Sequence, residues 1–277
     1  MFSTQTVSIR SIPVGAGRPL ALIAGPCVIE SEAHVRTMAR ELTQLTRSLG
    51  VPFVFKASYD KANRMSLSSY RGPGLAAGLA ILAGVKKEFD VPILTDVHGP
   101  EQVGPVAEVA DVLQVPAFLC RQTDIVLEVG RSGRVTNLKK GQFVAPWDMK
   151  HLVEKVHSTG NRQVLLTERG ATFGYGQLVV DFRSIAWMHE TGCPVVFDAT
   201  HSVQLPGGQG GRSGGLREMV PLLSRAGVAA GADALFLEVH DDPDRGLSDG
   251  PNMVKLGDLP ELLRQVTAIR ASLAPRA

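Results

Sequence analysis

The chain of 277 residues carries 29 lysines and arginines against 27 aspartates and glutamates, which gives a formal net charge of +2. This balance excludes a general attraction to nucleic acid or to an anionic membrane, so any anion recognition must be local. No apolar stretch approaches the ~18 uninterrupted residues of a membrane span, and residues 1–6 lack the basic and apolar regions of a secretory signal. We therefore expect a cytoplasmic protein.

Short β-prone runs alternate with longer segments of helical periodicity along the chain. In chain order, the strands expected are residues 20–24, 52–56, 93–96, 112–115, 135–138, 164–167, 195–198 and 234–238. The helices expected include residues 31–49, 75–89, 100–110, 147–158, 216–231 and 259–273. This alternation predicts right-handed βαβ units around a parallel sheet.

About eight such units match the ~250 residues of a TIM (β/α)8 barrel. No linker rich in Pro, Gly or Ser divides the chain, so we expect residues 1–277 to form a single barrel domain. An open, doubly wound sheet is the alternative, but no G-x-G-x-x-G follows the first strand. Alternating apolar and polar side chains within residues 1–19 predict a short β-hairpin at the N-terminal face of the barrel. The glycine-rich residues 205–215 predict a mobile loop or a close backbone approach to a ligand.

A cationic segment begins at the end of the second expected strand. Residues 56–64 contain Lys56, Lys61 and Arg64, and Arg71 follows shortly before two glycines. Loops after barrel strands hold the substrate, so this segment predicts an anion-binding loop. A solvated surface loop is the alternative interpretation. Polar clusters at the ends of the other expected strands favour the binding loop.

The strand ends supply six cations that a barrel would bring around one mouth: Lys56, Lys61, Arg64, Arg121, Lys139 and Arg169. Arginine binds phosphate in a bidentate way and lysine adds a mobile charge, so the set predicts one or two phosphorylated substrates. The absence of G-x-x-x-x-G-K-[ST] favours small metabolites over ATP. Surface salt bridges are the alternative for each cation. A Schiff base on Lys56 or Lys139 also stays open, whereas a serine hydrolase would need a G-x-S-x-G motif that is absent.

A second set of strand-end residues combines a thiol, an imidazole and two carboxylates: Cys27, His201, Glu238 and Asp249. Mixed sulfur, nitrogen and oxygen donors suit a borderline divalent ion such as Zn²⁺, Fe²⁺, Co²⁺ or Mn²⁺. No sequence spacing supports this grouping, and Asp96, His98 and His240 are equally eligible on composition. The three cysteines are too few and too scattered for a disulfide framework, so each is either a buried apolar residue or a functional thiolate.

Longer motifs resemble a known family. They are LIAGPCVIES at 22–31, FKASYDKANR at 55–64, SYRGPG at 69–74, LTDVH at 94–98, QVPAFLCRQTD at 114–124, KKGQF at 139–143, TERG at 167–170, FGY at 173–175 and DATHSVQ at 198–204. Together they closely resemble 3-deoxy-D-manno-octulosonate 8-phosphate synthases. The resemblance implies a homotetramer of TIM barrels that condenses phosphoenolpyruvate with D-arabinose 5-phosphate and water and releases inorganic phosphate. It leaves open whether the product serves lipopolysaccharide biosynthesis or another glycan.

The resemblance also implies roles for the cations and their neighbours. Lys139 and Arg169 would hold the phosphate of phosphoenolpyruvate, with Lys56, Lys61 and Gln114 near its carboxylate and reacting carbons.

The same resemblance places the sugar phosphate. Asn63 and Arg64 would bind the phosphate and hydroxyls of arabinose 5-phosphate, and Arg121 would reach it from a neighbouring subunit. His98 and Asp96 are implied as proton-relay candidates. The residues with implied catalytic roles are Lys56, Lys61, Asp96 and His201.

The residue after Gly-Pro at 25–26 separates two classes of this family, with cysteine in the metal-dependent class and asparagine in the other. Cys27 and the sequence QLPGG at 204–208 resemble the metal-dependent class. The resemblance therefore implies a divalent ion (Zn, Fe, Mn or Co) held by Cys27, His201, Glu238 and Asp249. Its role stays open between orienting the aldehyde, activating the attacking water and a structural function.

One position departs from the family. Many relatives read KANRSS, whereas this chain has Met65 in place of the first serine, which predicts weaker binding of arabinose 5-phosphate. The nearest alternative function is that of 3-deoxy-D-arabino-heptulosonate 7-phosphate synthase, which uses erythrose 4-phosphate. Asn63 within KANR disfavours it, because that enzyme resembles KPRT at this point. A non-catalytic sugar-phosphate sensor is disfavoured because every expected site position is occupied.

Overall fold

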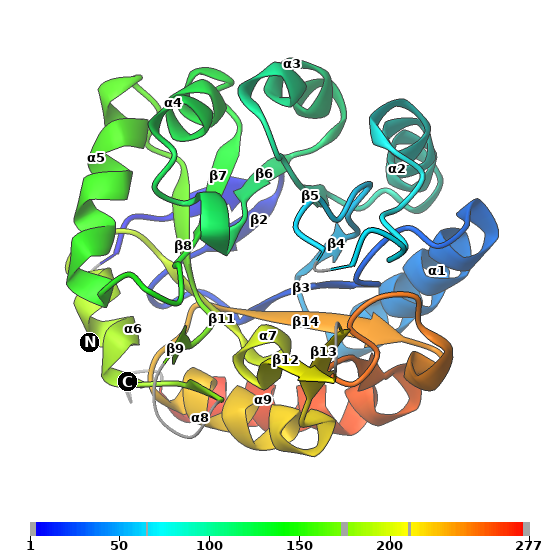
Figure 1. The fold of residues 1–277 in the computed structure, drawn as a ribbon. Coiled ribbons are helices and arrows are strands. Elements are labelled where there is room, and N and C mark those ends of the chain that lie inside the picture. The colour runs from blue at the N-terminus through cyan, green and yellow to red at the C-terminus, as the bar shows by residue number, and fades with distance from the viewer. Residues whose placement is uncertain (1–3, 65, 173–176, 210–211, 274–277) are drawn as a thin grey trace.

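The computed structural model describes residues 4–64, 66–172, 177–209 and 212–273, and a closed barrel of parallel strands lies at its centre (Figure 1). The strands pair in the order β11-β8-β7-β6-β5-β4-β3-β14, and pairing of β11 with β14 closes the ring. They are β3 (Ala21–Gly25), β4 (Phe53–Lys56), β5 (Ile93–Asp96), β6 (Val112–Val115), β7 (Val135–Lys139), β8 (Val164–Glu168), β11 (Val195–Asp198) and β14 (Ala234–His240). A short strand, β15 (Val254–Lys255), extends the pairing at the end of β14. The predicted TIM barrel is confirmed.

Helices surround the barrel, because parallel neighbours need a crossover between them. They are α1 (Glu32–Leu49), α2 (Leu75–Phe89), α3 (Pro100–Val109), α4 (Thr123–Arg131), α5 (Met149–Ser158), α6 (Arg183–His189), α7 (Ala199–Ser202), α8 (Val220–Ala229) and α9 (Leu259–Ser272). Short 3-10 turns occur at η1 (Ala117–Leu119), η2 (Pro146–Asp148), η3 (Arg217–Met219), η4 (Pro243–Arg245) and η5 (Leu256–Asp258). The six helices expected from the sequence are α1, α2, α3, α5, α8 and α9, with boundaries shifted by a few residues.

Two layers of apolar side chains form the core. The barrel interior is filled by Ala21, Ile23, Val54, Leu94, Val112, Val135, Leu165, Val196, Ala234 and Phe236. A larger layer, which includes Leu22 and Phe55, lies between the strands and the surrounding helices. Successive strand residues point to opposite faces and both faces are covered, so the strands are near-continuous apolar runs.

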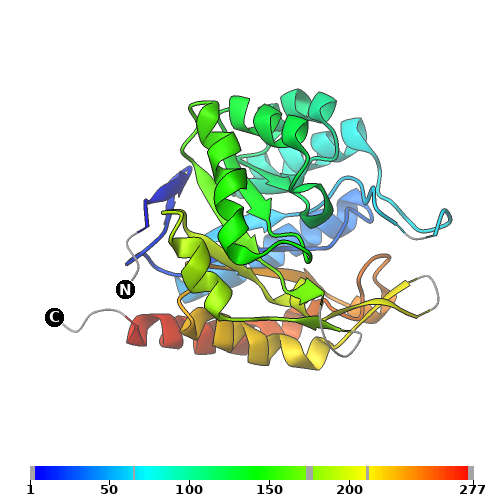
Figure 2. The ribbon, with the colours of Figure 1, turned by 60° about the vertical axis from the view of Figure 1, so that its left-hand side comes forward.

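The N-terminal hairpin is also confirmed. β1 (Val7–Ile9) pairs in antiparallel fashion with β2 (Ile12–Val14). Val7, Ile9 and Val14 are buried in the same cluster as the barrel interior. Figure 2 shows the hairpin at the end of the barrel opposite the long loops, so it closes the N-terminal face.

The described part of the glycine-rich segment forms a hairpin, which corrects the expectation of an irregular loop and leaves the predicted approach to a ligand untested. β12 (Gln204–Gln209) pairs with β13 (Arg212–Gly215) beside the mouth of the barrel. Glycine permits this pairing because ladder hydrogen bonds use only backbone groups. A smaller hairpin joins β9 (Ala171–Thr172) to β10 (Leu178–Val179). Within the described ranges, no helix has both the length and the apolar composition that crossing a bilayer requires.

Candidate active site

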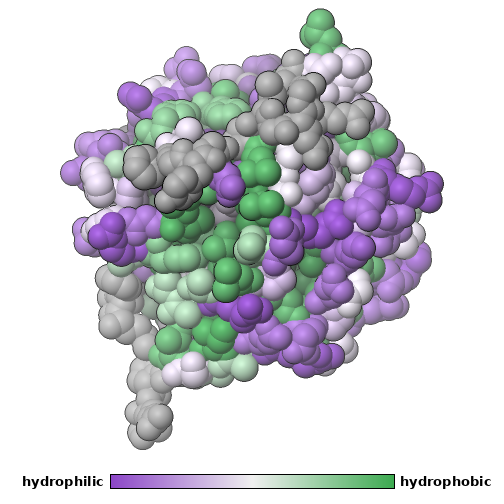
Figure 3. Space-filling model, turned by 60° about the horizontal axis from the view of Figure 1, so that its bottom comes forward, coloured by the Kyte–Doolittle hydropathy of each residue, from purple (hydrophilic) through white to green (hydrophobic). Residues whose placement is uncertain are grey.

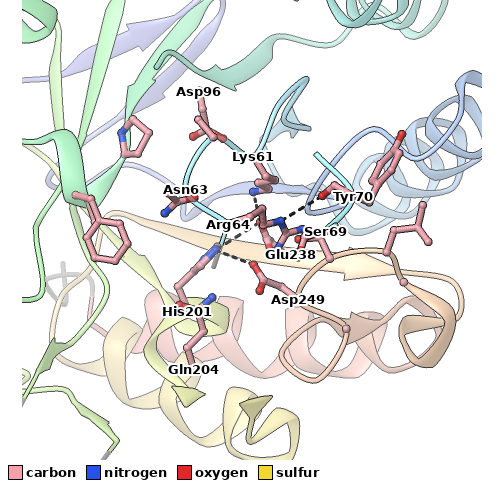
Figure 4. A pocket seen from close by; sticks show the side chains of 18 of the residues that line it. Lys61, Asn63, Arg64, Ser69, Tyr70, Asp96, His201, Gln204, Glu238 and Asp249 are labelled. Atoms are coloured by element: carbon pink, nitrogen blue, oxygen red, sulfur yellow. Dashed lines mark hydrogen bonds and ion pairs between the residues drawn. The ribbon is translucent and has the colours of Figure 1, made fainter. Parts of the chain in front are cut away.

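A cavity of about 1190 Å³ opens at the C-terminal ends of the barrel strands, where TIM-barrel chemistry is located. Twelve residues singled out from the sequence line it: Lys56, Lys61, Asn63, Arg64, Asp96, His98, Gln114, Lys139, Arg169, His201, Glu238 and Asp249. Figure 4 shows Lys61, His201, Glu238 and Asp249 converging from different elements of the fold. The cavity is large enough for two small phosphorylated molecules.

Cys27 lies just beneath this cavity because of the tight packing at the end of β3. A Cβ atom on Gly25 would collide with the carbonyl oxygen of Lys56, so only glycine lets the two strand ends approach this closely. Cys27 follows two residues later and is 1% exposed. Its thiol therefore faces the carboxylates at the end of β14 and in the following loop and not the solvent.

The four predicted metal ligands come together at this point. Cys27 Sγ lies 3.4 Å from Asp249 Oδ2. His201 Nε2 lies 3.6 Å from Glu238 Oε1 and 4.0 Å from Asp249 Oδ2. Ligand atoms of Cys27, Glu238 and Asp249 all lie within 4.8 Å of one another. Glu238 Oε2 is buried without a hydrogen-bond partner among the described residues, so the donor set fits a divalent cation.

Burial and the nearby carboxylates favour the protonated form of Cys27 in the metal-free protein, although Lys61 and Lys56 oppose them. Burial raises the pKa of the Cys27 thiol, and the neighbouring carboxylates of Glu238 and Asp249 raise it further. Glu238 itself stays ionised. Burial alone would raise the pKa of Glu238, but Lys56, His201 and Lys61 hold it well below its usual range.

His201 is oriented by a buried carboxylate that sequence reasoning had given no role. Asp198, at the end of β11, accepts a hydrogen bond from the backbone N–H of His201 at 2.9 Å. Its Oδ2 lies 2.8 Å from His201 Nδ1 and 2.6 Å from Lys139 Nζ. A carboxylate on one imidazole nitrogen directs the other nitrogen towards a metal, as is common for ligating histidines. The sequence signal was the spacing of three between Asp198 and His201 after a buried strand.

Two guanidinium groups in the cavity keep unused donors. Arg169 donates to Gln204 Oε1 at 2.5 Å, and its Nη1 has no hydrogen-bond partner within the described ranges. Arg64 donates to the carbonyl of Tyr70 at 3.2 Å, and its Nη2 is likewise unpartnered there. An arginine fork with a free N–H is suited to bind phosphate.

A chain of hydrogen-bonded polar side chains crosses the barrel below the cavity. Gln114 Nε2 donates to Asp96 Oδ1 at 2.5 Å, Asn137 Nδ2 donates to Gln114 Oε1 at 2.8 Å, and Thr167 Oγ1 donates to Asn137 Oδ1 at 2.7 Å. Ser58 donates to the other oxygen of Asp96. Burial alone would raise the pKa of Asp96, but Lys61 and Lys56 lower it, so this carboxylate is ionised. Sequence reasoning gave no role to Asn137, whose only signal was a polar residue within a buried strand, and it quoted Thr167 only as part of TERG at 167–170.

Arg121, unlike the other predicted site residues, lies neither in the cavity lining nor in the cluster beneath it. It lies between η1 and α4, is exposed, and is absent from the cavity lining. Its carbonyl accepts a hydrogen bond from Lys155 Nζ at 3.2 Å. Met65 and the FGY motif at 173–175 fall on residues outside the described ranges.

The barrel and its cavity, with buried cations beside a mixed-donor cluster, define a TIM-barrel enzyme for anionic substrates. Residues 3–273 match the DAHP synthetase I family, and the chain belongs to that family. Within it, the chain belongs with the 3-deoxy-D-manno-octulosonate 8-phosphate synthases, as the motifs predicted. It is 60% identical over 268 residues to a protein of Geobacter sulfurreducens named 2-dehydro-3-deoxyphosphooctonate aldolase, covering 97% of this chain and 98% of the relative. Relatives of the same name from Citrifermentans bemidjiense and Geobacter metallireducens are 57% and 58% identical over the same shares.

Proposed function

We propose that this protein condenses phosphoenolpyruvate with D-arabinose 5-phosphate and water to give 3-deoxy-D-manno-octulosonate 8-phosphate and inorganic phosphate. C3 of phosphoenolpyruvate attacks the aldehyde carbon of the open-chain sugar, water adds at C2, and phosphate leaves by C–O cleavage. The observation that carries the proposal is that buried cations from several strands share one cavity with the cluster around Cys27. The name shared by relatives of 57–60% identity supports it.

The positions of the cations support a division of labour between two anionic substrates. Lys139 and Arg169, both buried, would hold the phosphate of phosphoenolpyruvate. Lys56, Lys61 and Gln114 would face its carboxylate and reacting carbons.

Asn63 and Arg64 lie on the loop after β4 and would bind arabinose 5-phosphate. Asp96 and His98 both line the cavity and are the proton-relay candidates.

The metal proposed for this site is one of Zn, Fe, Mn and Co, held by Cys27, His201, Glu238 and Asp249. A bound divalent ion would supply Lewis-acid polarisation of the aldehyde or of the attacking water. Neighbouring residues would orient and balance these ligands. Asp198 fixes the ring of His201, and Lys56 pairs with the charge of Glu238 at 2.7 Å.

A phosphate-release assay tests the reaction and separates it from its nearest alternative. We expect turnover with phosphoenolpyruvate and arabinose 5-phosphate, little with erythrose 4-phosphate, and loss of turnover in chelator that added metal restores. Preference for erythrose 4-phosphate would favour the heptulosonate synthase that the family description names. Tight sugar-phosphate binding without turnover would favour a sensor. Activity that persists in chelator without copurifying metal would refute the metal assignment.

We also propose that the single-domain chains form a homotetramer in the cytosol, in which Arg121 reaches the active site of a neighbouring subunit. We propose no nucleic-acid or membrane partner. Large apolar side chains stay exposed at Phe118, Phe143, Trp147 and Leu222. Figure 3 shows hydrophobic surface between hydrophilic areas on one face of the molecule. Such surface favours contact between subunits.

Subunit mixing tests the role of Arg121. Chains with Arg121→Ala and chains with Lys139→Ala should each be impaired. Mixed tetramers should regain activity, because some sites combine an intact Lys139 with an intact Arg121 from the neighbour. A mixture no more active than the average of its parents would contradict the shared site.

A further inference from the structure

A second cluster of metal-ligating side chains lies outside the cavity. Glu30 precedes α1, His34 lies in the first turn of α1, and His240 is the last residue of β14. One ligand atom from each of the three lies within 4.8 Å of the other two. None of the three lines the active-site cavity. The two imidazole rings are in contact, with their centroids 4.3 Å apart and their planes tilted by 37°.

A single carboxylate lies beside both rings. Asp241 Oδ1 lies 3.0 Å from His34 Nε2 and 3.0 Å from His240 Nδ1. The opposite nitrogens, His34 Nδ1 and His240 Nε2, are both buried and have no hydrogen-bond partner among the residues described. His240 is 4% exposed, so its ring lies away from bulk solvent. Ligating histidines usually give their second nitrogen to a carboxylate in this way.

From this arrangement we propose that Glu30, His34 and His240 form a second site for a divalent transition metal of the zinc type. His240 Nε2 lies 3.4 Å from Glu30 Oε1. Two ligands bound at about 2.0–2.2 Å to a tetrahedral ion are separated by a similar distance, roughly 3.4 Å. Two imidazoles and one carboxylate leave a fourth position for water. The site contains no sulfur, which distinguishes it chemically from the cluster around Cys27.

This second site binds its ion more weakly than a preformed cage would. A metal on His240 Nε2 requires the ring proton to be on Nδ1, where Asp241 accepts it. The backbone N–H of Asp242 lies 2.9 Å from the same Nδ1 and loses its acceptor in that tautomer. Metal binding therefore replaces the hydrogen bond from Asp242 N–H to Nδ1 with one from Nδ1–H to Asp241. The net gain is the metal–ligand bonds alone.

An ion at this site would steady the loop that carries Asp249. Glu30 Oε1 accepts a hydrogen bond from the backbone N–H of Leu247 at 2.8 Å. Ser248, the next residue, contacts Cys27 Sγ at 2.9 Å. The second site thus contacts this loop at Leu247, and the next residue of the loop contacts Cys27. Metal bound at the second site should therefore raise the thermal stability of the protein.

Cobalt titration of the full-length, metal-stripped protein tests the proposal independently of catalysis. The natural chain should bind two Co²⁺ ions, one with a thiolate-to-cobalt absorption band and a weaker one without it. His34→Gln and Glu30→Gln should each bind one ion and keep the thiolate band. Asp241→Asn should weaken the sulfur-free site by about 10–100-fold. Cys27→Ser should lose the band and keep the sulfur-free ion.

His151→Gln is the matched control, because His151 lies exposed on α5 and pairs there with Glu154, away from both clusters. It should bind two ions, and circular dichroism should show that each variant folds. The proposal is overturned if the natural chain binds a single ion, or if His34→Gln and Glu30→Gln both still bind two.

Discussion

Lys56 Nζ lies 2.7 Å from Glu238 Oε1, and both side chains are only 1% exposed. Lys56 also donates to the carbonyl of Cys27 at 2.8 Å. It therefore contacts two proposed metal-binding residues, Cys27 and Glu238, which lie far apart in the sequence. Removing one partner of a buried ion pair costs about 3–5 kcal/mol, because the other charge is left uncompensated. Lys61 Nζ, at 3.7 Å from the same oxygen, can compensate only in part.

We therefore expect Lys56→Met to lower the free energy of unfolding of the metal-free protein by about 3 kcal/mol. Urea unfolding at one fixed subunit concentration measures it. Lys86→Met is the matched control, since Lys86 pairs with Asp111 at 2.8 Å but is 29% exposed. A pair that keeps partial contact with solvent should lose less than the fully buried pair, about 1 kcal/mol. Equal losses in the two variants would contradict the importance of burial.

Metal binding at Cys27 should depend on pH. Burial, Glu238 and Asp249 raise the pKa of the thiol, so the metal-free protein holds the proton, whereas the metal ligand is the thiolate. One proton must leave as the metal binds, and the affinity should rise about tenfold per pH unit. Zn²⁺ competition titrations above about pH 7.5, where ordinary histidines are neutral, measure this slope.

Cys27→Ala supplies the comparison for that slope. Its carboxylates and imidazole should still bind metal weakly, with a shallower dependence on pH. The same slope in the variant and in the natural chain would mean that the thiol is not a ligand.

The sequence predicted the barrel well because its elements are defined locally. β5 and α2 have the predicted boundaries, and α2 lies between Gly74 and Asp90, both of which have positive φ. The start of α5 was predicted at Trp147, but η2 occupies Pro146–Asp148 first, and periodicity does not separate a 3-10 turn from the helix it precedes. α4 and α6 were missed because segments of nine and seven residues give a weak periodic signal.

The site was less predictable because it depends on contacts between distant parts of the chain. Cys27 and Asp249 are 222 positions apart, and no spacing rule connects them. Donor chemistry alone left that grouping open, and resemblance to a family selected it. It supplied nothing for Asn137, whose contact with Gln114 depends on strand register, or for His34 and His240, which meet only because the end of β14 reaches α1.

The substitution at Met65 carries a prediction that stands on sequence alone, since this residue lies outside the described ranges. Its neighbours Arg64 and Ser66 both line the cavity. Met65→Ser should lower the Michaelis constant for arabinose 5-phosphate by a few-fold, because a hydroxyl adds a hydrogen bond of about 0.5–1.5 kcal/mol. The constant for phosphoenolpyruvate should not change. Met65→Ala is the control that removes the side chain without adding a hydroxyl, and an equal gain in both variants would exclude the hydroxyl as the cause.

Asn137 fixes which end of the Gln114 amide faces Asp96. Because Asn137 donates to Gln114 Oε1 at 2.8 Å, the amide nitrogen of Gln114 is directed to Asp96, at 2.5 Å. Asn137→Leu removes this donor and lets the amide rotate. If the misoriented amide loses one hydrogen bond of about 0.5–1.5 kcal/mol to phosphoenolpyruvate, kcat/KM for that substrate should fall about 2–12-fold.

Steady-state kinetics with varied phosphoenolpyruvate measures the effect of Asn137→Leu, and Thr136→Val is its matched control. Thr136 is buried in the same strand, and its hydroxyl has no hydrogen-bond partner among the described residues, so its loss should leave kcat/KM unchanged. An equal decrease in both variants would indicate damage to β7 and not to the orientation of Gln114. Unchanged kinetics in Asn137→Leu would show that Asp96 alone is sufficient to hold the amide.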